Sequence, residues 1–139
     1  MTRVLKTSGF LGLAVMMSVG LYQNYLLAGG GSVPGWMIGG HAHLGVLSIL
    51  AVVVGFAVPA LGVVGRLRQA VTGLFVVGQW GLPVTIWAGE GGGLSFLMPT
   101  TFLWGLCLVV AMLLMAWQAA TTAEEERRET APSATPADD

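Results

Sequence analysis

Residues 41–69 read HAHLGVLSILAVVVGFAVPALGVVGRLRQ, and this stretch decides the fold. From His41 to Val64 it contains no Lys, Arg, Asp or Glu, and the loop that follows carries Arg66 and Arg68. A transmembrane helix needs about 20 mostly apolar residues. The stretch therefore predicts a membrane-spanning helix that ends in a short basic loop.

Three further segments on either side of this stretch have the same character, at about 8–28, 70–88 and 96–119. Of the 139 residues, 55% are hydrophobic and 9% are charged, whereas soluble domains carry about 25% charged residues. We therefore expect an all-α fold, a bundle of four transmembrane helices with short loops within residues 1–120. Residues 121–139 are polar and are expected to form a tail that begins as a frayed helix end and continues as disorder.

The basic residues fix the orientation that we expect in the lipid bilayer. All six fall before the first span, between the second and third, or after the fourth: Arg3, Lys6, Arg66, Arg68, Arg127 and Arg128. Cytoplasmic loops collect Lys and Arg, so both termini are predicted to be cytoplasmic. No organellar targeting segment is visible, which favours the plasma membrane of a prokaryote. A net charge of −1 gives no electrostatic basis for binding nucleic acid.

Small residues recur in the first and third spans. Glycine lets helix backbones approach closely in lipid, where packing replaces the hydrophobic drive between helices. We expect these glycines to be packing sites: Gly9, Gly12, Gly20, Gly73, Gly78 and Gly81.

Polar residues of the spans gather toward the outer ends, around the two histidines. His41 and His43 begin the second span, while Asn24, Thr85 and Glu90 lie near the same depth. Two residues apart on a helix means about 200° apart around its axis, so one histidine should face inward and the other the interface or a loop. Histidine is the commonest metal ligand, although Asn, Gln and Thr here could equally serve to bond helices together.

His43 shares a helix face with Val46, Leu47 and Leu50. One imidazole above an apolar wall suits haem, whose iron a single proximal histidine can hold. It suits zinc poorly, because zinc sites use three or four protein ligands. The sequence has no Cys-x-x-Cys-His, which excludes covalent attachment of the c type.

The segment from Gly35 to Gly45, GWMIGGHAHLG, with AVPALG at 57–62, resembles the styrene oxide isomerases. Members of that family carry a Trp, then Ala-His-x-Gly, an apolar span and Leu-Pro-x-Leu-Gly. GLYQN at 20–24 and Trp80 resemble further parts of the family. The resemblance covers most of the first three spans and fades in the fourth.

The resemblance implies a four-helix membrane protein that forms a trimer and binds haem b through one axial histidine. It implies a haem-dependent isomerase in which the iron, as a Lewis acid, converts a small apolar epoxide to an aldehyde. The match assigns the axial role to His43 and places Asn24 on a cofactor-binding Asn; His41 is the alternative ligand. The family's Asn after the histidine and its acid before the Trp are replaced by Ile49 and Gly78.

Two other functions fit the same residues. A non-catalytic redox or accessory membrane subunit would use haem with a second axial ligand. A structural membrane protein without a cofactor would leave both histidines at the membrane interface.

Overall fold

The computed structural model describes the backbone of residues 2–130 and the side chains of residues 3–123. The backbone forms four long helices: α1 (Thr2–Ala28), α2 (Gly35–Ala60), α3 (Gly65–Ile86) and α4 (Thr100–Thr130). A π-helical turn, η1 (Trp87–Gly91), continues α3, and a 3-10 turn, η2 (Ser95–Leu97), precedes α4. No strand occurs within residues 2–130.

All four helices are long and apolar enough to cross a membrane. The prediction of an all-α bundle with four membrane spans is thereby confirmed, and the chain is a multi-pass membrane protein.

The helices begin and end at different residues from those expected. The first begins at Thr2 rather than near residue 8, and α2 covers 35–60 rather than 41–64. The third begins at residue 65 rather than 70, and α4 at 100 rather than 96. The early start of α2 follows from Pro34, whose carbonyl accepts from the Met37 and Ile38 amides. His41 and His43 therefore lie in the second and third turns of α2, deeper than the sequence indicated.

The polar tail begins as a continuation of α4. The helix extends through the first ten residues of the polar segment, 121–130. Its four Glu and two Arg residues are good helix formers. Residues 131–139, predicted to be disordered, lie outside the described residues.

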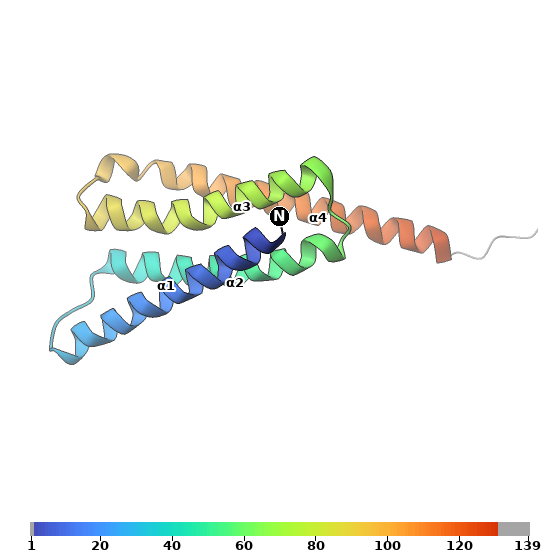
Figure 1. Ribbon diagram of the computed structural model, residues 1–139. Coiled ribbons are helices and arrows are strands. Elements are labelled where there is room, and N and C mark those ends of the chain that lie inside the picture. Colours follow the sequence, from blue (N-terminus) through green and yellow to red (C-terminus); the bar gives the residue numbers. More distant parts are fainter. Residues whose placement is uncertain (1, 131–139) are drawn as a thin grey trace, which may run out of the picture.

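The helices form two antiparallel hairpins, α1 with α2 and α3 with α4, joined where α2 packs on α3 (Figure 1). Below, the histidine end is the end formed by residues 29–43 and 86–101, and the arginine end holds the α2–α3 connection at 61–64. Helix α4 contacts α3 above all, and 6% of its apolar span is buried, against 39% for α2 and α3. Helix α4 is therefore an edge helix.

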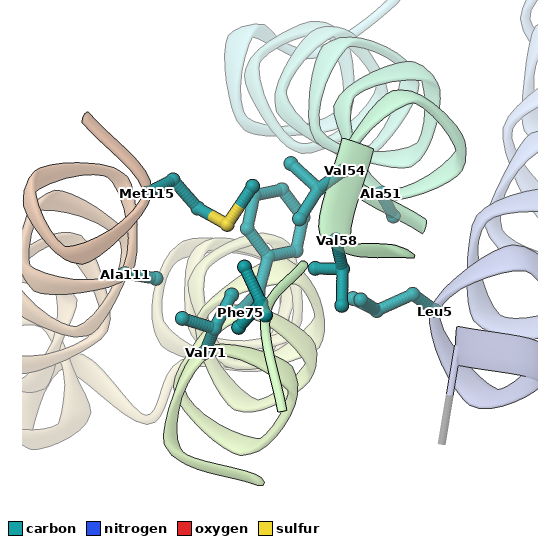
Figure 2. Close-up of a cluster of buried hydrophobic side chains, with 9 residues drawn as sticks. Leu5, Ala51, Val54, Val58, Val71, Phe75, Ala111 and Met115 are labelled. Atoms are coloured by element: carbon teal, nitrogen blue, oxygen red, sulfur yellow. The ribbon is translucent and has the colours of Figure 1, made fainter. Parts of the chain in front are cut away.

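The apolar core lies toward the arginine end and draws on all four helices (Figure 2). Phe75 of α3 is its largest side chain and is 1% exposed. The other members are Leu5, Ala51, Val54, Val58, Val63, Val71, Ala111 and Met115. The pockets near the histidines lie at the opposite end of the bundle from this core.

Candidate functional site

The two histidines lie on different sides of α2. His43 lines a pocket of about 370 Å³ that opens between α2, α3, η1 and the start of α4. His41 lines another pocket of about 550 Å³ between α1 and α2. The expectation that a spacing of two separates the imidazoles is thus confirmed, although neither histidine is enclosed by the bundle core.

The His43 side chain is exposed, and its ring is hydrogen-bonded to the backbone of its own helix. Nδ1 lies 2.8 Å from the carbonyl oxygen of Gly39, one turn earlier on α2. Because a carbonyl can only accept, Nδ1 carries the proton. In the neutral ring, Nε2 then keeps its lone pair and has no hydrogen-bond partner among the described residues. A histidine nitrogen is prepared in this way for a metal, whose ligating histidines almost always donate their other N–H to a carbonyl, carboxylate or water.

Apolar side chains surround this imidazole on both sides. The 370 Å³ pocket is lined by Trp36, Leu82, Ile86, Met98, Thr101 and Glu90, together with His43 and glycines of α2. On the other side of His43, a pocket of about 280 Å³ is lined by Ala42, Val46 and Leu47. The predicted apolar wall below His43 is present, and Glu90 is the one acidic group lining either pocket.

The η1 turn brings Glu90 to the pocket rim. Its wider geometry is defined by the Gly92 amide, which donates to the Trp87 carbonyl five residues earlier at 2.9 Å. Such π turns inside helices occur frequently at functional sites. Gly91 makes room for the ring of Trp36, because a Cβ at position 91 would come within 2.9 Å of that ring. The turn therefore shapes the pocket wall as well as its rim.

Asn24 does not lie with His43. It lines the 550 Å³ pocket together with His41, Gln23 and Gly20, and its amide nitrogen donates to the Gly20 carbonyl at 3.1 Å. The structure thus does not bring together the predicted cofactor-binding residues His43 and Asn24. Asn24 lies beside His41, the alternative ligand. Thr85 is also elsewhere, since its hydroxyl accepts from the Trp104 indole at 2.9 Å and joins α3 to α4.

A buried polar network in the middle of the bundle was not predicted from the sequence. Gln79 is fully buried; its Oε1 accepts from the Ser8 hydroxyl, and its Nε2 donates to the Ser8 carbonyl and to Ser48 Oγ. The Trp80 indole donates to the Ser8 hydroxyl at 2.8 Å. The available signal was the presence of Ser8, Ser48 and Gln79 within apolar runs, where polar groups need partners.

The family model of a domain of unknown function, DUF8059, matches residues 1–139. No curated protein and no solved structure matches the chain.

Proposed function

The chain belongs to the DUF8059 family, and we propose that it is a membrane protein that binds haem b through His43. The observation that carries the proposal is the hydrogen bond from Nδ1 of His43 to the Gly39 carbonyl. It holds the imidazole to α2 and leaves Nε2 free for an iron atom. His43 therefore needs no change of tautomer or side-chain partner to act as an axial ligand.

The surroundings of His43 suit the flat, largely apolar porphyrin ring. Apolar side chains line the pockets on either side of the imidazole. Trp36 supplies an indole face on which an aromatic macrocycle can stack. The histidine end offers no Lys or Arg, so the propionate groups would point toward water rather than into the protein.

Bound haem would supply an iron centre for electron transfer or Lewis-acid chemistry. In this proposal His43 would hold the iron, and Trp36 and Leu82 would cover one side of the bound group. The Thr101 hydroxyl donates a hydrogen bond to the Met98 carbonyl.

Haem binding has more support here than epoxide isomerisation, the reaction that the resemblance implies. At the position of the family's acid, Gly78 packs against α4, where a Cβ would lie 2.6 Å from the Leu108 side chain. At the position of the family's Asn, Ile49 is 54% exposed on the outer surface of α2. Asn24 lies in the other pocket, away from His43. We therefore propose a haem protein without the isomerase residues.

Visible spectroscopy tests the proposal directly. The full chain is purified in detergent with haem supplied, beside His43→Ala and the matched control His41→Ala. We expect a Soret band in the natural chain and in His41→Ala, and its loss in His43→Ala. A further variant, His43→Gly, should regain the band when free imidazole is added, because the cavity left by the side chain can admit the missing ligand.

Two outcomes would contradict the proposal. A chain that stays colourless with excess haem has no haem site. A band that disappears in His41→Ala and persists in His43→Ala would transfer the site to the other pocket. If the site is present, turnover of an aryl epoxide would separate an isomerase from an electron carrier.

A further inference from the structure

The pocket beside His41 is the largest of those at the histidine end, and the haem proposal does not use it. It has a volume of about 550 Å³, within the range of about 300–1,000 Å³ typical of small-molecule sites. It lies between the last turns of α1, the α1–α2 connection and the start of α2. The exposed Tyr22 and Tyr25 lie on the same turns of α1. Tyrosine is enriched where the membrane meets water, so the pocket belongs to that depth.

His41 brings an unused polar atom to this pocket. Its Nδ1 is buried and has no hydrogen-bond partner among the described residues. Gly20 makes room for the ring, because a Cβ at position 20 would lie 3.0 Å from His41 Cε1. A nitrogen closed off in this way cannot be reached from the pocket, so a ligand would meet Nε2 of His41, which is not buried and has no hydrogen-bond partner among the described residues.

The neighbouring amides present acceptors. The Gln23 amide donates one hydrogen bond to the Met37 carbonyl, and the Asn24 amide donates one to the Gly20 carbonyl. Their carbonyl oxygens, Oε1 and Oδ1, have no hydrogen bond among the described residues. Each amide keeps a second N–H, Ser32 brings a hydroxyl group, and Nε2 of His41 accepts or donates according to its tautomer. The pocket therefore offers both acceptors and donors.

The remaining lining excludes ions. Leu27, Val33 and Ile38 are apolar, Ser32 is polar but uncharged, and no charged side chain among the described residues lines the pocket. A charged ligand would lose its hydration without gaining a counter-charge, which is strongly unfavourable. A molecule with an apolar body and a hydroxyl group meets both parts of the lining.

We propose that the His41 pocket binds an uncharged, lipid-soluble molecule through a hydroxyl group that His41 and Asn24 recognise. The site is separate from the haem proposal, since His43 does not line it. Phenols and sugar headgroups of glycolipids share this chemistry, and the experiment distinguishes them.

The two histidines make a direct measurement possible. The untagged full chain carries only His41 and His43, so labelling with [¹⁵N]histidine gives two imidazoles, which His41→Ala and His43→Ala assign by NMR. The chain is held in an amine oxide detergent, which carries no hydroxyl group. The probes are 4-butylphenol, its methyl ether, and octyl glucoside.

We expect 4-butylphenol to shift the His41 resonances in a saturable way and to leave those of His43 unchanged. The methyl ether has nearly the same shape but no donor, so it should bind at least about tenfold more weakly. Asn24→Leu removes an acceptor at similar volume and should weaken binding by about tenfold, whereas Tyr25→Leu, outside the pocket, should not. A response to octyl glucoside in place of the phenol would identify a sugar headgroup as the source of the hydroxyl.

Three results would overturn the proposal. One is a shift that grows linearly with probe concentration, which indicates partition into the micelle. Another is equal binding of the phenol and its ether. The third is the absence of any response of His41 to either hydroxyl probe. The His41 resonances report on this pocket whether or not His43 binds haem. Failure of the haem proposal would therefore leave this test valid.

Discussion

Gln79 joins three helices through one side chain. Its amide contacts Ser8 of α1 and Ser48 of α2 from its own position on α3. In lipid the apolar tails surround every helix equally, so burial of apolar surface gives no preference among helix neighbours. A shared amide does give a preference, because moving any one of the three helices would leave a buried polar group without its partner.

Replacing Gln79 with Leu should destabilise the fold by about 1–3 kcal/mol, since three buried hydrogen bonds are lost. The matched control is Gln69→Leu, at an exposed position near the start of α3, where we expect a change within about 0.5 kcal/mol. The free energy of unfolding can be measured in mixed micelles by titration with SDS. Equal stability of the two variants would show that the network contributes nothing.

Each hairpin of helices is closed by glycines. Gly9 of α1 lies against Val52 and the Ser48 carbonyl of α2, where a Cβ would come within 2.7 Å of both. Gly78 of α3 lies against α4 in the same way. Such contacts admit no methyl group without a shift of one helix, so the residue type decides the distance between the helices.

Gly78→Ala should destabilise the α3–α4 hairpin by about 1–3 kcal/mol because the added methyl overpacks the interface. Gly105→Ala on α4 is the control; a Cβ there meets nothing within 4 Å, and alanine favours helix by about 0.5–1 kcal/mol. In thermal unfolding followed by circular dichroism, we expect the Tm of Gly78→Ala to be lower than that of the natural chain. The Tm of Gly105→Ala should be equal to it or higher. A reversed order would contradict the packing described for α4.

The sequence allowed the element types to be predicted, but it did not allow every contact to be predicted. Apolar runs identify spans because the bilayer requires them. The rotation of a helix about its axis is set by its neighbours and leaves a weaker signal in the sequence. Gly73, for example, was expected to be a packing site, yet it faces open space. For the same reason, depth and the family resemblance suggested that Asn24 and His43 share a site, whereas rotation of α1 places Asn24 beside His41.

The described part of the molecule has the histidine-lined pockets at one end and the apolar core at the other. Its direction in the membrane is a prediction from the one-sided Lys and Arg residues. We propose that the histidine end faces outward.

Cysteine labelling tests this direction. In a Cys107→Ser background, Ser32→Cys lies in the exposed α1–α2 connection and Val64→Cys in the α2–α3 connection. A maleimide that cannot cross membranes should label Ser32→Cys in intact cells and Val64→Cys only after the membrane is opened. The opposite pattern would invert the topology and place both histidine pockets on the cytoplasmic side.

The shared amide of Gln79 also has a consequence for synthesis at the ribosome. The chain emerges in order, so the first hairpin enters the bilayer while Gln79 is still inside the exit tunnel. Until α3 arrives, Ser8 and Ser48 face each other's helix without the group that later joins them. We therefore expect the newly inserted first hairpin to be loosely held, and insertion of α3 to be the step that locks it. A ribosome stalled while α3 is still in the exit tunnel and α2 has left it would display the looser hairpin. A ribosome stalled after α3 has cleared the tunnel would display the locked one.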